Sequence, residues 1–495
     1  MRRPPSFMYG WTMETEEARS LLLRLRDALS RNDRAQSNAI ALALVAGNPP
    51  LGRQWKAIST LLQHNGEVAG ARAAMDFYVA ATGNDPASLY DKAALLAQTA
   101  SVAQAYDLLQ QLPPDAPDPH ANAYSRGTMA INLGRFDEAR AALRQALAVQ
   151  PNSGQSRLAL AMLGRVEPED AERIRNGTAR LNQQTPLEQA AWHYALGRLG
   201  EREGDIDGAA SAYAAGAAIM ARLRPADLKR DRDDAQQATE GWHAHVIARL
   251  ASELDGAGVS RPIFVTGLPR SGTTLVEQIL VSHSEVENGE ELGLMRFVHQ
   301  DVGDFGYPSL ERYLVGGGSV AALRALYDRL LAQRFPGPGR VVDKTLNSSR
   351  SMGLIGSLFP DAPVIWVRRD PVDCAWSAYR NWFNQGLDWS WSLEAMAFHF
   401  KLEDALFFHW RQVLPSRIHV VAYEELVTEP EQVIAEMLEF CGLDFQPAVL
   451  QPELTARTVT TASVAQVREK ITPASIGSAK PYHRFMAPFM QAYYS

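Results

Sequence analysis

Residues 262–291 read PIFVTGLPRSGTTLVEQILVSHSEVENGEE, and the rest of the fold can be predicted outward from this stretch. It begins with a short apolar run, passes through a loop bounded by Gly267 and Gly272, and continues as an amphipathic run. Strand, glycine-bounded loop and helix form a phosphate cradle, because backbone N–H groups and the positive end of the helix dipole converge on one anion. Thr273 and Thr274 add hydroxyl donors. The stretch therefore predicts an anion-binding turn between a strand and a helix.

The loop departs from the P-loop that hydrolyses nucleotides. The glycine spacing is that of a P-loop, but Thr273 stands where such a loop carries Lys, and the cation is Arg270 instead. A P-loop kinase is thereby disfavoured but stays an alternative, as does a purely structural glycine turn. The run P-R-S-G-T-T resembles the 5′-phosphosulfate loop of sulfotransferases, which use 3′-phosphoadenosine 5′-phosphosulfate (PAPS). The resemblance is closest to the tyrosylprotein and tetratricopeptide-containing branch, because Gly289, Glu290 and Glu291 follow at that branch's distance. It implies that the loop residues hold the donor: Pro269, Arg270, Ser271, Gly272, Thr273 and Thr274.

The chain from residue 262 onward alternates short apolar strands with helical stretches. The strands are expected at residues 262–266, 339–344, 362–368 and 418–423. These strands are apolar throughout, without alternating polar residues, and helices separate them. This pattern predicts a parallel sheet that is covered on both faces. Ligands of such sheets bind at the carboxyl ends of the strands. Polar groups follow all four strands, which predicts an anionic-ligand site at this edge: Arg270 with Ser271, Lys344, Arg369, and Tyr423 with Glu424.

A second motif, VIWVRRDPVDCAWS at residues 364–377, ends a strand in two arginines and then starts a helix through Asp370 and Pro371. Guanidinium and hydroxyl groups together suit a phosphate monoester, so Arg369 and Ser377 are candidates for one site. The motif resembles the family's 3′-phosphate motif, which implies that these two residues grip the 3′-phosphate. The alternative is that Arg369 pairs with a carboxylate on the helix.

Further landmarks of the resemblance lie towards the C-terminus. The run Y-E-E-L-V from Tyr423 implies that this tyrosine lies near the cofactor, although it could equally be a helix start. Ser463 and Lys480 lie in stretches that resemble the family's cofactor-covering segment. Ala479 stands where the family usually has Trp, which puts the packing of this lid in doubt.

Sulfuryl transfer needs a base for the acceptor hydroxyl and positive charge at the leaving oxygen. The resemblance implies that Glu291 is the base and that Arg270 and Lys344 stabilise the charge; no metal is expected. Glu290 is the rival base, and Glu291 could instead be an exposed loop acid. We interpret His283 as a core or capping histidine rather than as the base.

The N-terminal half is rich in Ala, Leu, Arg and Glu, which predicts helix throughout. The turn glycines Gly66, Gly134 and Gly204 are spaced by about two 34-residue units, and their surroundings fit the tetratricopeptide pattern. Such helix pairs stack into a solenoid with a concave surface. We expect this surface to bind the acceptor, a partner protein or peptide, or a second copy of the chain as a homodimer; a plain scaffold is the alternative.

Composition sets the outer bounds. The 495 residues predict at least two domains, which we place at 1–255 for the helical repeats, with residues 222–253 as last helix and connector, and 256–495 for the sulfotransferase domain. The net charge of −7 argues against nucleic-acid binding. Two cysteines, with no signal peptide or membrane span recognisable, predict a cytoplasmic protein. The expected function is transfer of a sulfuryl group from PAPS to a hydroxyl of a peptide tyrosine, a sugar or a small molecule; the alternatives are the kinase and a catalytically inactive scaffold.

Overall fold

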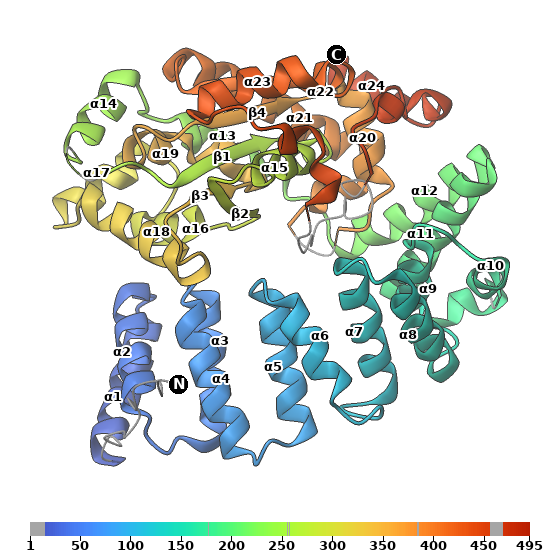
Figure 1. Ribbon diagram of the computed structural model, residues 1–495, viewed down its shortest axis with the longest axis horizontal. Helices are drawn as coiled ribbons and strands as arrows, with labels where there is room; N and C mark the ends of the chain where they lie inside the picture. The colour runs from blue at the N-terminus through green and yellow to red at the C-terminus, as the bar shows by residue number, and fades with distance from the viewer. Residues whose placement is uncertain (1–14, 177, 255, 257, 384–385, 456–468) are drawn as a thin grey trace.

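The computed structural model describes residues 15–176, 178–254, 256, 258–383, 386–455 and 469–495. An arc of helix pairs runs below a parallel sheet that is flanked by helices (Figure 1). Ser463 lies outside the described residues. Among the described residues, no helix is both long and apolar enough to cross a membrane.

The N-terminal region is helical, as predicted, and its helices pack as antiparallel neighbours along the chain. The turn glycines Gly66, Gly134 and Gly204 all take positive φ values, of 83°, 74° and 75°, which a residue with a Cβ adopts only at a cost. Ala100, in the turn between α5 and α6, takes the same left-handed conformation, at φ 64°. The helices are α1 (Thr15–Ser30), α2 (Arg34–Gly47), α3 (Trp55–His64), α4 (Val68–Ala81), α5 (Pro86–Gln98), α6 (Val102–Gln110), α7 (Pro119–Asn132), α8 (Phe136–Val149), α9 (Gly154–Ala161), α10 (Pro168–Arg175), α11 (Pro186–Glu203) and α12 (Ile206–Leu223).

The sheet has five parallel strands in the order β2-β3-β1-β4-β5. They are β1 (Pro262–Gly267), β2 (Val286–Glu290), β3 (Arg340–Asp343), β4 (Val364–Arg368) and β5 (Ile418–Ala422). Four of them were predicted, but the sequence-based count of four strands is wrong because it omits β2. This edge strand reads VENGE and buries little besides Val286 and Gly289, so it carries no apolar run that would reveal it.

Both faces of the sheet are covered, as expected for apolar parallel strands. Alternate residues of β1 separate the two cores: Ile263 and Val265 face one side, and Phe264 faces the other. The first core contains α15 (Thr273–Val281), α22 (Tyr423–Thr428) and α23 (Pro430–Cys441). The second contains α13 (Leu228–Thr239), α14 (Ala244–Ser252), α16 (Met295–Val302), α17 (Tyr307–Val315), α18 (Val320–Arg334), α19 (Met352–Leu358) and α21 (Leu393–Val413). The remaining helices are α20 (Pro371–Tyr379) and α24 (Ala487–Tyr494).

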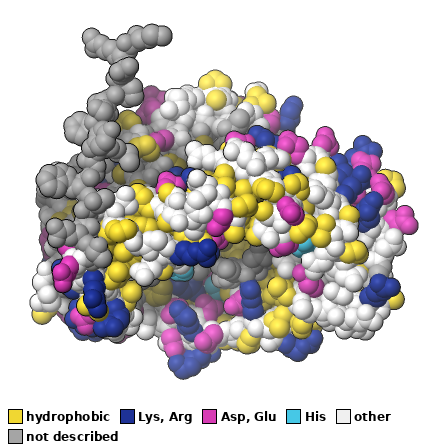
Figure 2. Space-filling view, turned by 90° about the horizontal axis from the view of Figure 1, so that it is seen from below, with side chains coloured by type: hydrophobic (Ala, Val, Ile, Leu, Met, Phe, Trp, Pro, Cys, Tyr) yellow, Lys and Arg dark blue, Asp and Glu magenta, His cyan; other side chains and the backbone are white. Residues whose placement is uncertain are grey.

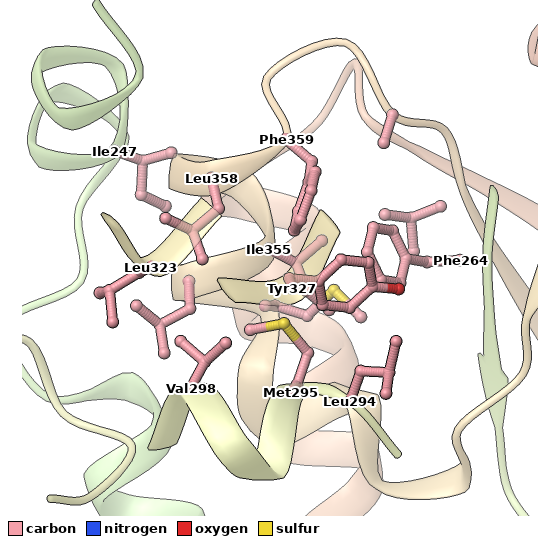
Figure 3. Packing of buried hydrophobic residues seen from close by; sticks show 14 of the residues in the cluster. Ile247, Phe264, Leu294, Met295, Val298, Leu323, Tyr327, Ile355, Leu358 and Phe359 are labelled. Carbon is pink, nitrogen blue, oxygen red and sulfur yellow. The ribbon is translucent and has the colours of Figure 1, made fainter. Parts of the chain in front are cut away.

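The helices α13 and α14 belong to the core under the sheet rather than to the arc. Ile247 of α14 points into the same cluster as Phe264 and Phe359 (Figure 3). Trp242 lies so close to α19 that a Cβ on Gly353 would come within 2.3 Å of its indole ring. Residues 222–253, interpreted from the sequence as the last helix and connector of the arc, thus include two helices that pack in this core, and the domain boundary stays a prediction. The packing favours a boundary near Asp227, upstream of the one placed at residue 255.

The arc is attached to the sheet region near both of its ends. Near the N-terminus, the buried carboxylate of Glu67 accepts hydrogen bonds from Arg329 and Gln333 of α18, at 2.6 and 2.8 Å. At the other end, α11 and α12 share a core with α20, in which Tyr213 packs against Trp376.

Viewed from below, the molecule shows acidic and basic side chains interspersed with apolar ones (Figure 2).

Candidate active site

The loop after β1 folds into the predicted cradle because two glycines allow close approaches. A Cβ on Gly267 would lie 2.5 Å from the carbonyl oxygen of Val367, and one on Gly272 would lie 2.5 Å from the Tyr423 ring. Both glycines take positive φ values, of 146° and 107°. The loop thus turns tightly into the N-terminus of α15, where Thr273 and Thr274 are buried.

Arg270, within this loop, also has a left-handed backbone, with φ 72°, and its side chain reaches across to α20. Its Nε donates to Ser377 Oγ at 2.9 Å. Burial, reinforced by the guanidinium groups of Arg380, Arg198 and Arg369, lowers the pKa of Arg270 to about 9. Arg270 remains cationic at neutral pH, so several positive charges are gathered where the sequence predicts an anion.

Arg369 lies just after β4, in a helix start that is built as predicted, since Asp370 caps α20 by accepting from the Asp373 N–H at 2.9 Å. Its guanidinium donates to the carbonyl oxygens of Arg270 and Ser475. It lies 4.4 Å above the Tyr423 ring. It also lies 3.6 Å from the Asp373 carboxylate, as in the alternative considered from the sequence. Its buried Nε has no hydrogen-bond partner among the residues that the structure describes, which leaves a donor for a further acceptor.

These groups line one cavity of about 160 Å³ at the carboxyl ends of β1, β4 and β5. Tyr423 lines the cavity and is also the first residue of α22, so the helix start is confirmed, whereas its place near the cofactor stays a prediction. Cationic, hydroxyl and aromatic groups around one cavity suit a ligand that carries phosphate and an aromatic base. The lining residues are Arg270, Gly272, Thr273, Thr274, Leu275, Arg369, Tyr423, Val427, Glu469, Lys470, Ile471, Thr472, Ala474 and Ser475.

Lys344 and Glu291 form an ion pair at the carboxyl ends of the neighbouring strands β3 and β2. Lys344 follows β3, its side chain is only 1% exposed, and Nζ lies 2.5 Å from Glu291 Oε1. The loop that carries Glu291 is fixed by the Lys344 N–H, which donates to the Glu290 carbonyl oxygen at 2.9 Å. Glu290 itself points elsewhere, with a carboxylate oxygen 3.9 Å from Arg334. The residues predicted to act as base and as charge stabiliser therefore lie together, with Glu291 half exposed.

Several residues singled out in the sequence do not line the cavity, Ser377 among them. Lys480 is exposed and does not line it, whereas Lys470 does. Pro269 and Ser271 are buried within the loop and do not line it either. His283 is buried, with Nε2 at 2.7 Å from the Asp444 carbonyl oxygen and Nδ1 accepting from the Glu285 N–H, which agrees with its interpretation as a core histidine.

Sequence reasoning missed several residues that hold the site together. The carboxylate of Asp373 accepts from the Gly477 and Ala479 N–H groups at 2.7 and 2.8 Å, so it fastens the C-terminal segment over the cavity, with the small side chain of Ala479 buried. Arg198 of α11 donates to Asn381 Oδ1 at 2.5 Å. Glu277 of α15 is buried beside Lys344. Only Asp373 had a signal in the sequence, its position four residues after Arg369.

Residues 262–447 match the sequence model of the sulfotransferase family. The chain is 31% identical over 378 residues to an uncharacterized protein of Aquifex aeolicus, covering 73% of this chain and 48% of that protein. It is 26% identical over 216 residues to protein-tyrosine sulfotransferase 2 of Gallus gallus, covering 42% of this chain and 57% of that protein. The resemblance to sulfotransferases is thus confirmed, while the chain spans about half the length of the curated relatives it matches.

Among solved structures, the sulfotransferase domain of the Synechococcus PCC 7002 olefin synthase is similar with 19% identity and a TM-score of 0.34. The match covers 47% of this chain and 95% of that domain.

Proposed function

We propose that the chain is a sulfotransferase that transfers a sulfuryl group from PAPS to an acceptor hydroxyl. The observation that carries this proposal is the single cavity in which the start of α15, Arg369 and Tyr423 meet, with the Lys344–Glu291 pair beside it. The match of residues 262–447 to the sulfotransferase family supports the same reaction.

The residues around the cavity fit an anionic nucleotide. Arg369 offers an unused buried donor, and Ser377 and Arg270 are already in contact. We assign the 3′-phosphate to Arg369 and Ser377, and the 5′-phosphosulfate to the loop that ends in Thr273 and Thr274. Lys480 and Ser463 stay candidate cofactor residues by resemblance alone.

When bound, the donor supplies an activated sulfuryl group. The Glu291 carboxylate would accept the proton of the acceptor hydroxyl, and Lys344 with Arg270 would stabilise the negative charge on the departing phosphate oxygen. Among the described residues, no three His, Cys, Asp or Glu side chains are arranged to hold a metal. Metal-free catalysis nevertheless stays a prediction.

We infer that the helix pairs of the arc form a tetratricopeptide-type solenoid that binds the acceptor, a partner protein or a second copy of the chain. The turns at Gly66, Gly134 and Gly204 support this inference, because they share a positive φ and recur about every two repeat units. A cytoplasmic location also stays a prediction, supported by the free, buried thiols of Cys374 and Cys441.

The proposal is tested by thermal stabilisation with nucleotides. At equal concentration, a ligand that binds only the folded state raises the melting temperature more the more tightly it binds, so 3′-phosphoadenosine 5′-phosphate should stabilise the chain far more than ATP or ADP. A larger shift with ATP and magnesium would favour the kinase. Transfer of labelled sulfate from PAPS to peptide, glycan and lipid extracts then identifies the acceptor, and binding without any transfer would favour the inactive scaffold.

A further inference from the structure

Two carboxylates of very different exposure flank the Lys344 ammonium. Glu291 Oε1 lies 2.5 Å from Nζ, and the Glu291 side chain is 45% exposed. Glu277 Oε2 lies 3.9 Å from the same Nζ, and the Glu277 side chain is 3% exposed. One partner can therefore leave towards solvent, and the other is fixed in the interior.

The position of Glu277 is set by the backbone around it. It lies in α15, directly after the cradle loop, and its side chain packs under β2. A Cβ on Gly289 would lie 3.1 Å from Glu277 Cγ and 2.8 Å from Val342 Cβ. The glycine that precedes Glu290 and Glu291 thus leaves the space that the Glu277 side chain needs beside Lys344.

This arrangement bears on how Glu291 can act as a base. A carboxylate that hydrogen-bonds an ammonium is a poor proton acceptor, because the ammonium favours its charged form. Glu291 must therefore release Lys344 before it takes a proton. A buried ammonium without any counter-charge is strongly destabilised, so the release is feasible only if another carboxylate stays behind.

We propose that Glu277 is a positioning residue that serves as the permanent counter-charge of Lys344, so that Glu291 can exchange the ammonium for the acceptor hydroxyl. The Lys344 side chain then stays buried and charged while its ammonium turns from Glu291 to the leaving phosphate oxygen. This inference rests on the proposed function, and it adds to it a residue outside the motifs that carry the family resemblance.

The first test measures stability without any ligand, in the full chain. E277Q and E291Q should each lower the melting temperature modestly, because one carboxylate remains. The double variant should lose clearly more than the sum of the two, because Lys344 is then buried without either of these two carboxylates. Adding K344M to the double variant should restore much of the loss, since it removes the stranded charge.

The proposal is overturned if the losses in melting temperature of E277Q and E291Q simply add in the double variant and adding K344M restores none of the loss. If the double variant does not fold, folding of the triple variant supports the proposal and its failure to fold overturns it. These measurements use no nucleotide, so they remain decisive even if 3′-phosphoadenosine 5′-phosphate does not bind the wild-type chain and the proposed function fails.

The second test separates turnover from binding. E277Q should lower turnover about 10-fold or more, while affinity for 3′-phosphoadenosine 5′-phosphate is unchanged or higher, because removing a carboxylate does not weaken anion binding. E277D should recover part of the turnover. The matched control is E67Q, which removes another buried carboxylate paired with a cation, Arg329, and should leave turnover intact. If E277Q loses affinity and turnover equally, and E277D recovers neither, then Glu277 has a merely structural role.

Discussion

At the scale of single residues, the two adjacent acids after β2 have different partners. Glu291 pairs with the buried Lys344, and Glu290 faces Arg334. Since general-base catalysis is typically worth about 10²–10⁴-fold, Glu291→Gln should lower turnover by that factor without weakening nucleotide binding. Steady-state kinetics with binding titrations would check this.

Glu290→Gln is the matched control for the base and should be milder. A dead Glu290→Gln with an active Glu291→Gln would place the base one residue earlier. His283 is no reserve candidate, because both of its ring nitrogens are engaged in the interior.

Arg369 and Arg368 provide a second matched pair. Arg369 faces the cavity, whereas Arg368 pairs with Asp404 at 2.5 Å and stacks on Phe407. Arg369→Ala should weaken binding of 3′-phosphoadenosine 5′-phosphate by on the order of 2–5 kcal/mol, as for a buried charge pair that loses one partner. Arg368→Ala should leave the affinity near wild type in isothermal titration. Equal effects of the two variants would contradict the assigned 3′-phosphate site.

His299 makes the stability of the fold depend on pH. Burial lowers the pKa of His299 to about 4, and its ring nitrogens contact the Asp304 carbonyl oxygen and Ser351 Oγ. Below pH 6.5 the unfolded chain binds a proton that the folded chain does not, so stability falls as the pH falls from 6.5 towards 4. The loss should total about 3 kcal/mol at roughly 1.4 kcal/mol per pKa unit.

Chemical denaturation at pH 7 and pH 5 checks this prediction. His299→Gln should have a lower free energy of unfolding than wild type at pH 7, and this difference in free energy should be smaller at pH 5. An identical pH dependence in the two proteins would show that His299 is not responsible.

At the scale of elements, the apolar strands β1, β3, β4 and β5 were predictable because burial on both faces leaves an unbroken apolar run. The edge strand β2 was not, because its placement depends on pairing with β3 and on room for Glu277 under Gly289. The site followed the same division. Motifs identified Arg270, Arg369 and Tyr423 of the cavity lining, but the position of Lys470 in the lining and partners from distant helices, such as Arg198, depend on tertiary packing.

Helix α11 is linked to the cradle by a chain of hydrogen bonds. Arg198 donates to Asn381, Asn381 Nδ2 donates to the Ser377 carbonyl oxygen at 2.5 Å, and Ser377 Oγ accepts from Arg270. Arg198→Ala should weaken nucleotide binding by about 1 kcal/mol, as for loss of one hydrogen bond that holds a ligand group in place.

Arg202 is the control on the same helix, because it donates to the Leu163 carbonyl oxygen within the arc. Arg202→Ala should lower stability with little effect on affinity. If the two variants lose affinity equally, α11 acts through general packing rather than through Asn381.

At the scale of the whole molecule, buried clusters join residues on both sides of residue 255. Trp242 and Ile247, upstream of that point, are buried in the core under the sheet, and Tyr194 and Tyr213 of the arc share a core with Trp376. The sequence alone predicts that residues 1–250 contribute to acceptor choice or assembly and not to sulfuryl chemistry, and that a fragment starting near Gly256, if soluble, still binds the nucleotide. The packing argues against that expectation.

We therefore expect a fragment of residues 256–495 to be insoluble or to lack cooperative unfolding, because it exposes the apolar surface that α13 and α14 cover and the surface of α20 that α11 and α12 cover. A fragment of residues 227–495 restores α13 and α14 but still lacks α11, so it should fold less stably than the full chain and bind 3′-phosphoadenosine 5′-phosphate more weakly. The comparison uses circular dichroism melting and titration of the two fragments beside the full chain. If the shorter fragment folds cooperatively and binds with full affinity, the arc is a separable domain and its contacts with α20 do not support the donor site.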